Sequence, residues 1–337
     1  MTLRFVEQRD LTALLRGLCA ARTVYYPQQT DDGYRLARSR EEEAFLAPFS
    51  QYRVTQPMKV LFFPPRERID EDPPAPEKLA IIGAKACDVG SIQNLDTVFL
   101  QGEFEDPFYA SVRHNALIIS SDCTGFRESC FCTRLGVPPY PTAGFDLNLS
   151  PVSGGFVVEI GSDQGADLAG TMSCLHEASE DQVQERDANR KDMAERVAAD
   201  RASRWEKDWD VRDATAANLE SDIWQDRAAR CVECGGCNLA CPNCFCFMVS
   251  DRPAGDWFER RRLWDSCQYK GYAKIAAGYT RARLAQRVRN RFIHKFLYTR
   301  DNYGVYGCFG CGRCTEVCLA KIDIREVLED LLDAKPV

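Results

Sequence analysis

The first half of the chain contains four short apolar runs that predict buried strands. Each run is four to six residues long and is bounded by Pro, Gly or Asp: 59–63, 79–83, 116–120 and 156–160. Between the second and third runs, the apolar residues of 91–100 recur with a helical period. A strand, a helix and a strand in this order predict a right-handed crossover onto a parallel sheet.

Helical patterns dominate elsewhere. Near the N-terminus, 11–18 has helical spacing and 23–27 has the composition of a short strand. Residues 171–230 hold fifteen acidic and ten basic residues, no Pro and one Cys. This composition is typical of helices joined by short turns, so we expect a helical connector over 171–228. A last amphipathic helix is expected over 324–332.

Length and composition indicate a globular protein. The 337 residues suggest two or three domains, and the chain is 45% hydrophobic and 28% charged. A net charge of -7 argues against a nucleic-acid partner. No run approaches eighteen apolar residues, so we expect no membrane insertion. The N-terminus lacks the apolar core of a signal peptide, which favours a cytoplasmic location.

Cysteine is the residue type that departs most from the average. The chain has 17 cysteines but only three histidines. Cytoplasmic thiols are kept reduced, and the number is odd, so a set of disulfides explains these cysteines poorly. The cysteines therefore point to metal. Neither a G-x-G-x-x-G fingerprint nor a Walker loop occurs, so nothing in the sequence indicates a bound nucleotide.

Two cysteine runs share the spacing C-x2-C-x2-C-x3-C, which is typical of bacterial ferredoxins with two [4Fe-4S] clusters. The first three thiolates of a run bind one cluster, and the fourth points toward the other cluster, so we expect crossed ligation. The ligands of the first cluster would be Cys231, Cys234, Cys237 and Cys318. The ligands of the second would be Cys308, Cys311, Cys314 and Cys241.

Structural zinc is the alternative, but it usually takes separated C-x2-C pairs that close one tetrahedron. Glycines within the runs would let the backbone approach the sulfides of a cluster: Gly235, Gly236, Gly310 and Gly312. Pro242 follows the first run as the ferredoxin pattern requires, whereas Leu319 follows the second. Because this proline contributes no ligand, the ligand set is unchanged.

A third group of cysteines follows the predicted strands of the N-terminal half. Cys87 and Cys123 come shortly after two strands that would run in the same direction, so both should reach the carboxyl edge of one sheet. Cys130 and Cys132 follow within ten residues of Cys123. Four thiols at one edge predict a third [4Fe-4S] cluster, although some of them could simply be small buried side chains. Asp88 and Asp122 would add negative charge beside this cluster.

Five cysteines remain outside these sets. Burial is the expected role of Cys244, Cys246, Cys267, Cys19 and Cys174. The first three could hold a further cluster, but the sequence offers no obvious fourth ligand.

The segment 281–300 carries seven Lys or Arg and no acidic residue. A nucleic-acid groove and a solvated helix face are two interpretations. A third is that the cations stabilise anionic clusters or dock an acidic partner, and this one is favoured. A structural role is expected for His294.

Several motifs of this chain, taken together, resemble the β subunits of soluble [NiFe] sulfhydrogenases, whose relatives include the A subunit of anaerobic sulfite reductase. In the N-terminal half the motifs are GAKACDVGSIQNLDTVF, DPFYASVR, SSDC, CFCTRLG and GFDL. In the C-terminal half they are CVECGGCNLACPNCFCF, RRLWDSCQY, HKFLY and GCFGCGRCTEVCLAKIDI. The resemblance runs from about residue 56 to 335. It implies an electron-transfer subunit that carries several [4Fe-4S] clusters and links a flavoprotein acting on NAD(P) to a catalytic subunit.

The sequence thus predicts an α+β chain in three parts. These are an α/β domain with a third cluster over 1–170, the helical connector over 171–228, and a two-cluster ferredoxin-like α-helical domain over 229–337. The expected function is electron relay in a soluble hydrogenase-type complex. Relay within a sulfite, heterodisulfide or other reductase is the second hypothesis, and a zinc-stabilised interaction module is a third.

Overall fold

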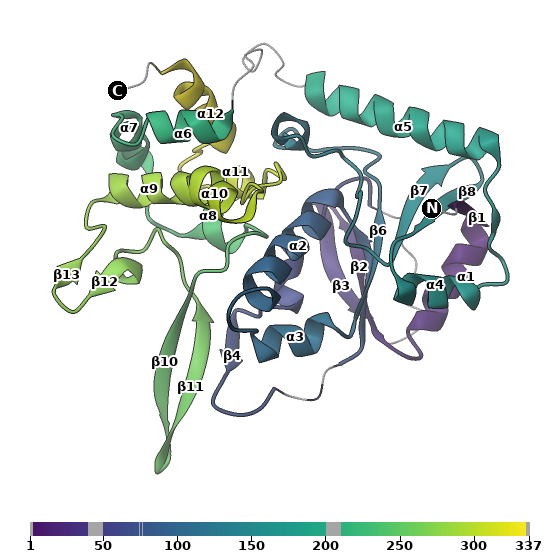
Figure 1. Ribbon diagram of the computed structural model, residues 1–337, viewed down its shortest axis with the longest axis horizontal. Coiled ribbons are helices and arrows are strands. Elements are labelled where there is room, and N and C mark those ends of the chain that lie inside the picture. The colour runs from purple at the N-terminus through teal and green to yellow at the C-terminus, as the bar shows by residue number, and fades with distance from the viewer. Residues whose placement is uncertain (1–2, 40–49, 74, 76, 200–209, 335–337) are drawn as a thin grey trace. The chain divides into compact units, whose positions relative to one another are not determined.

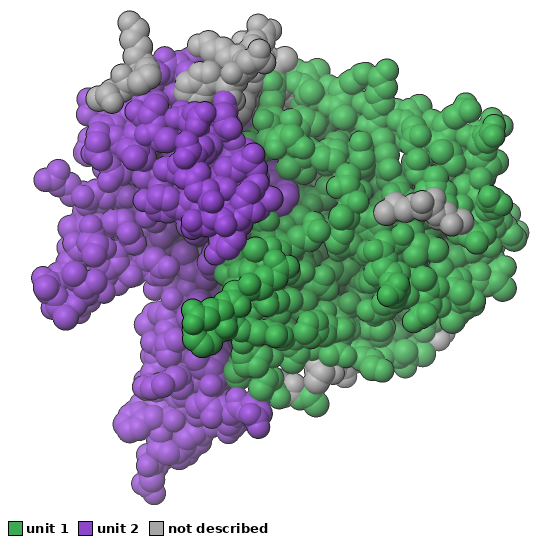
Figure 2. All heavy atoms as spheres, in the orientation of Figure 1, with its two compact units in different colours: residues 1–62, 73–200 green, residues 63–72, 201–337 purple. Residues whose placement is uncertain are grey.

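The computed structural model describes residues 3–39, 50–73, 75, 77–199 and 210–334. The chain divides into two compact units (Figure 2): Met1–Phe62 with Pro73–Asp200, and Phe63–Asp72 with Arg201–Val337. Both units contain helices and strands, so the predicted α+β class is confirmed. Among the described residues, no helix is long and apolar enough to cross a membrane.

The first unit is built on a mixed sheet (Figure 1) whose eight described strands follow the order β3-β2-β5-β6-β7-β8-β1-β9. The strands are β1 Leu3–Glu7, β2 Thr23–Thr30, β3 Gly33–Ser39, β5 Leu79–Ala84, β6 Ala116–Ser121, β7 Leu147–Val152, β8 Gly155–Ile160 and β9 His176–Glu177. Strands β2, β5, β6 and β7 are parallel to one another, and the other pairs are antiparallel. Every residue of β5 and β6 is buried, as is typical of central parallel strands.

Helices connect and cover these strands: α1 Gln8–Leu18, α2 Ala86–Leu100, α3 Pro107–Arg113, α4 Asp163–Gly170 and α5 Glu180–Ala199. Helices α2 and α3 lie between β5 and β6 in the chain and complete the predicted crossover between parallel strands. The strands expected over 79–83, 116–120, 156–160 and 23–27 are confirmed, and so are the helices expected over 11–18 and 91–100.

One predicted strand is wrong. The apolar run 59–63 overlaps a short 3-10 helix, Met58–Leu61. Local backbone bonds from Val60 and Phe62 back to residues three positions earlier close its turns. Phe62 is fully buried and packs against the ring of Tyr109, with 6.0 Å between the ring centroids. A short apolar run indicates burial but not backbone conformation, so a buried helical turn satisfies the pattern as well as a strand does.

The segment 171–228, expected to be one helical connector, is divided between the units. Its longest helix, α5, packs against β7 and β8 in the first unit. Met193 and Val197 supply its buried apolar positions. Arg190 bonds Asp122 and Glu159, so α5 is fastened to the sheet by charge as well as by apolar packing. The later helices of the segment, α6 Val211–Ala217 and α7 Ile223–Arg230, belong to the second unit.

The second unit is mainly helical. Besides α6 and α7 its helices are α8 Gly236–Leu239, α9 Leu284–Ile293, a π-helical stretch His294–Tyr298, α10 Thr299–Tyr303, α11 Arg313–Glu316 and α12 Ile324–Asp333. Helix α12 is the amphipathic helix predicted at the end of the chain. Val327, Leu328 and Leu331 are each at most 1% exposed on its inner face.

A hairpin that the sequence analysis missed extends the second unit (Figure 1). Strands β10 Phe247–Ala254 and β11 Trp257–Trp264 pair along their full length, and β4 Arg66–Arg68 pairs with β11. Gly255 has a positive φ of 74° in the two-residue turn, which is a hairpin signal that the sequence contained. Smaller strands, β12 Lys274–Ile275 and β13 Gly278–Tyr279, form a second antiparallel pair.

Candidate metal centres

The two cysteine runs fold in the same way. In each, a loop with the first cysteines reaches a glycine with positive φ, which caps a four-residue helix carrying the third cysteine. Gly235, with φ 69°, precedes α8 and Cys237, and Gly312, with φ 73°, precedes α11 and Cys314. Helices α8 and α11 contact each other, so the internal repeat of the sequence becomes a pair of facing loops.

The fourth cysteine of the second run joins the first three of the first run. One pocket of the second unit is lined by Cys231, Cys234, Cys237, Cys314 and Cys318, together with Arg291 and several apolar side chains. Burial raises the pKa of Cys308 to about 12, and its thiol also interacts with those of Cys314 and Cys241. The second set of thiols therefore includes the fourth cysteine of the first run.

The thiols of the two cysteine runs line a pocket and do not converge on a single point. Among the described residues, no three Cys, His, Asp or Glu side chains lie close enough to hold a single metal ion. Structural zinc requires four ligands around one ion, whereas each thiolate of a [4Fe-4S] cluster binds a different iron. A set of separated thiols around a pocket therefore fits a cluster better than it fits zinc.

Two buried cations of the basic segment face these thiols. Arg291 and Lys295 are 7% and 3% exposed, and they lie four residues apart on one helical face. Lys295 Nζ donates to Cys241 Sγ at 3.1 Å and to the Gly307 carbonyl at 3.1 Å. Burial lowers the pKa of both cations, but the surrounding thiols more than offset this and hold the pKa of each well above its usual value.

Arg291 also has donors that the protein does not satisfy. Within the described part of the chain, its Nε and Nη2 atoms are buried without a hydrogen-bond acceptor. The thiols of Cys237, Cys314, Cys244 and Cys241 are among its electrostatic neighbours. Buried donors of an arginine normally require an acceptor, and the sulfides and thiolates of an anionic cluster supply acceptors. The cysteine thiols, as ligands, and the unsatisfied N–H groups of Arg291, as hydrogen-bond donors, therefore both fit a bound cluster.

The third cation on this face has a different task. Arg287 is 2% exposed, and its guanidinium donates to the carbonyls of Gln268, Arg281 and Ala282. It also pairs with Glu233, which lies between the first two cysteines of the first run. Arg287 therefore fixes the first cysteine loop. Since the key cations are buried, this face of α9 is not the solvated face that was one interpretation of the basic segment.

His294 has the packing of a structural residue. Its ring meets Phe245 edge-on, with 5.7 Å between the ring centroids. Burial, helped by the charge of Lys295, lowers the pKa of His294 to about 4. The imidazole is therefore neutral near pH 7.

The N-terminal cysteines gather at the expected edge of the sheet. Cys87 lies in the first turn of α2 directly after β5, and Cys123 follows β6, the parallel neighbour of β5. Burial raises the pKa of the Cys132 thiol, and the neighbouring thiols of Cys123 and Cys130 raise it further. The chain thus brings the thiols of Cys123, Cys130 and Cys132 into electrostatic contact with one another.

A buried lysine that the sequence analysis missed lies among these thiols. Lys85 is 1% exposed, and its Nζ donates to Ser121 Oγ and to the Asp122 carbonyl, both at 2.8 Å. Burial lowers the pKa of Lys85, while the Cys123 and Cys87 thiols, with other acidic neighbours, oppose that shift. The sequence feature that could have identified Lys85 is its position, one residue after β5 and two residues before Cys87.

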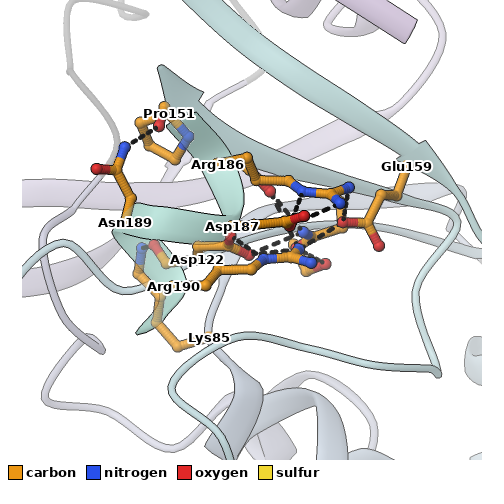
Figure 3. Close-up of polar contacts among 11 residues, drawn as sticks. Lys85, Asp122, Pro151, Glu159, Arg186, Asp187, Asn189 and Arg190 are labelled. Carbon is orange, nitrogen blue, oxygen red and sulfur yellow. Dashed lines mark hydrogen bonds and ion pairs between the residues drawn. The ribbon is translucent and has the colours of Figure 1, made fainter. Parts of the chain in front are cut away.

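The charge of Asp122 is compensated, which differs from the expectation that it would add net negative charge. Figure 3 shows Arg190 from α5 meeting both Asp122 and Glu159. Arg190 Nε donates to Asp122 Oδ2 at 2.7 Å, and the guanidinium lies 4.4 Å from the centroid of the Tyr140 ring. A pocket of about 320 Å³ lined by Asp122, Cys123 and Arg190 opens beside this network.

Two of the remaining cysteines have the expected packing role. Cys19 is 7% exposed and belongs to the apolar core of the first unit, and Cys174 packs against that core. Cys244, Cys246 and Cys267 lie in the second unit, where Cys267 is 6% exposed.

Comparisons with known proteins agree with this geometry. A family model described as a 4Fe-4S dicluster domain matches residues 230–322. The chain is also 29% identical over 326 residues to the sulfhydrogenase 2 subunit beta of Pyrococcus furiosus, covering 91% of this chain and 92% of that protein. The resemblance drawn from the motifs is thereby confirmed, and the C-terminal part of the chain carries an iron–sulfur dicluster domain.

The contact between Lys295 and Cys241 generates a prediction about potential. Lys295→Gln removes a positive charge beside Cys241, an expected cluster ligand, and this loss disfavours the reduced, more negative form of a cluster held there. One cluster potential should become more negative by on the order of 50 mV. An EPR-monitored redox titration of the full chain measures the shift.

Arg289→Gln is the matched control for Lys295→Gln. Arg289 lies six residues before Lys295, in α9, but it is partly exposed and pairs with Glu220. Its replacement should move neither potential appreciably, because exposed charges are screened by solvent. Equal potentials in the Lys295→Gln variant and the unaltered chain, with full cluster content, would contradict the assigned contact.

Proposed function

We propose that this chain is an electron-transfer subunit that relays electrons between a flavin- and NAD(P)-binding subunit and a catalytic subunit of the soluble [NiFe]-hydrogenase type. The observation that carries the proposal is the pair of facing cysteine loops around the buried, partly unsatisfied Arg291. Bound [4Fe-4S] clusters would supply one-electron chemistry. The residues of the chain would hold them, exclude water and provide the compensating charge. The relative's printed name, a sulfhydrogenase beta subunit, supports the choice of host complex.

The first cysteine loop also has the surface character that a relay needs. Cys234 is exposed, and Val232 and Leu319 beside the ligand positions are 59% and 74% exposed. Exposed apolar side chains around a redox centre favour docking of a partner protein. Leu319, which replaces the usual proline, contributes to this surface. The proposal therefore places one cluster where electrons can enter or leave the chain.

A reductase host is the second candidate. Sulfite, heterodisulfide or other reductases would use the same relay with a different catalytic subunit. A zinc-stabilised module is disfavoured, because the described thiols do not converge on a single ion. The cytoplasmic location stays a prediction.

The relay proposal predicts the behaviour of the isolated chain. The anaerobically purified full chain should be brown, accept electrons from dithionite and return them to an oxidised dye, as followed by absorbance and EPR. By itself it should neither evolve hydrogen nor reduce NAD(P). A colourless chain containing only zinc would refute it, and so would sustained turnover of either reaction. Mass spectrometry of the native complex then separates a hydrogenase host from a reductase host.

Crossed ligation is proposed for the dicluster domain. The first cluster would use Cys231, Cys234, Cys237 and Cys318, and the second would use Cys308, Cys311, Cys314 and Cys241. The pocket that places Cys318 beside the first three cysteines supports the first set. The contact of Cys308 with Cys241 and Cys314 supports the second. Cys314 also lines the first pocket, so the two sets lie next to each other.

Paired variants test the crossing. Cys318→Ser and Cys231→Ser should weaken the same EPR signal, and Cys241→Ser and Cys308→Ser should weaken the other. The second signal should also be the one whose potential responds to Lys295→Gln. If Cys241→Ser grouped instead with Cys231→Ser, each run would bind its own cluster and the crossed assignment would be wrong.

A third [4Fe-4S] cluster is proposed for Cys87, Cys123, Cys130 and Cys132. The electrostatic contacts among Cys123, Cys130 and Cys132 support it. The buried Lys85 interacts with both Cys87 and Cys123, and a positive charge buried among thiols favours an anionic centre. The network of Arg190 and Asp122 would hold the loop that carries Cys123. This centre would lie in the first unit, separate in sequence from the dicluster domain.

Iron content tests the third cluster. The full chain should bind about twelve irons, and Cys130→Ser should lower this to about eight. Cys174→Ser is the control, because Cys174 packs against the apolar core and should leave iron content unchanged. About eight irons in the unaltered chain after complete reconstitution would show that these four cysteines bind no cluster.

A further inference from the structure

Two cysteines outside the cluster sets meet at the base of the β10–β11 hairpin. The hairpin register pairs Phe247 with Trp264, and the Asp265 amide extends it by donating to the Cys246 carbonyl at 2.9 Å. Cys246 precedes the first strand, and Cys267 follows the second strand by three residues. The hairpin thus brings together two cysteines that are twenty-one positions apart in the chain.

The two sulfur atoms are in direct hydrogen-bond contact. The Cys267 thiol donates to Cys246 Sγ, and the Tyr272 hydroxyl donates to the same sulfur. On the other side, Asn238 Nδ2 donates to Cys267 Sγ at 3.0 Å. Asn238 is 1% exposed, so the Cys267 sulfur is held in a fixed position.

This contact distinguishes the pair from the proposed cluster ligands. Ligands of a [4Fe-4S] cluster bind different irons and stay apart, whereas two sulfurs in contact are arranged to bond to each other. No third Cys, His, Asp or Glu of the described residues completes a single-ion site with them. We propose that Cys246 and Cys267 form a redox-active dithiol–disulfide pair that exchanges with low-molecular-weight disulfides.

The two thiols have unequal environments, which assigns their roles. Cys246 is partly exposed, and the hydrogen bond from Cys267, together with that from Tyr272 and the charge of Lys295, lowers its pKa to about 6 against the cost of burial. Cys267 is buried, and its hydrogen bond to Cys246 and its burial raise its pKa. Cys246 is therefore the attacking thiolate and Cys267 the resolving thiol.

The exchange balances without any further oxidant. The Cys246 thiolate attacks one sulfur of the small disulfide, forms a mixed disulfide and releases one thiolate. Cys267 then loses its proton and attacks the Cys246 sulfur, which releases the second thiolate and closes the Cys246–Cys267 bond. The small disulfide is reduced by two electrons to two thiols, and the protein pair is oxidised by two electrons.

Thiol trapping of the full chain tests the proposal. The anaerobically purified chain, with its clusters, is equilibrated with mixtures of reduced and oxidised glutathione, quenched in acid, alkylated and digested. The fraction of Cys267 found in a disulfide with the tryptic peptide 231–260 should rise at least about fivefold from reducing to oxidising mixtures and fall again with dithiothreitol. Iron content should stay constant. Absence of the linkage at every ratio would overturn the proposal, and this measurement needs no variant.

Matched variants identify the partner of Cys267. Cys246→Ser should abolish the linkage, and Cys244→Ser, two positions away in the same peptide, should preserve it. Iron content should match the unaltered chain in both. Loss of about four irons in Cys246→Ser would instead make Cys246 a cluster ligand and refute the pair. Since iron reports the clusters and trapping reports the pair, the electron-relay proposal and this one can fail separately.

Discussion

The second unit depends on the balance between buried positive charge and sulfur. Arg291 and Lys295 project from one helical face into thiols supplied by both cysteine runs. Burying an unpaired cation is costly, so these side chains are stable inside the unit only where negative charge or strong acceptors face them. An anionic cluster provides both, and the cations in turn offset the repulsion between its thiolates. We expect folding of this unit to be coupled to cluster binding for that reason.

The cysteine loops are positioned by the same helix. Arg287, one turn before Arg291, caps carbonyls of the preceding segment and pairs with Glu233 inside the first loop. Glu233 itself has a positive φ of 53°, a backbone conformation that residues with a side chain disfavour. The ion pair with Arg287 helps to hold Glu233 in this conformation. One face of α9 therefore both orders the first ligand loop and places charge between the two thiol sets.

The first unit uses a comparable arrangement at the edge of its sheet. Lys85 is buried among the N-terminal thiols and is held by Ser121 and the Asp122 carbonyl. The Asp122 side chain is bonded in turn by Arg190 from α5, which is sixty-eight residues away in the chain. The helix that looked like a connector thus fixes the loop carrying Cys123, and this explains why it folds with the sheet.

The sequence by itself determined the elements and ligand candidates that depend on local spacing. The buried strands at 79–83 and 116–120, the crossover between them and the repeated cysteine spacing all follow from short-range pattern. Tertiary structure alone decided which thiols face each other, that 58–61 is a helical turn and that α5 belongs to the sheet. It also decided that Cys246 meets Cys267. These outcomes depend on contacts between residues that are far apart in the sequence. The energies of such contacts are set by burial and charge in three dimensions, and no periodic pattern along the chain indicates them.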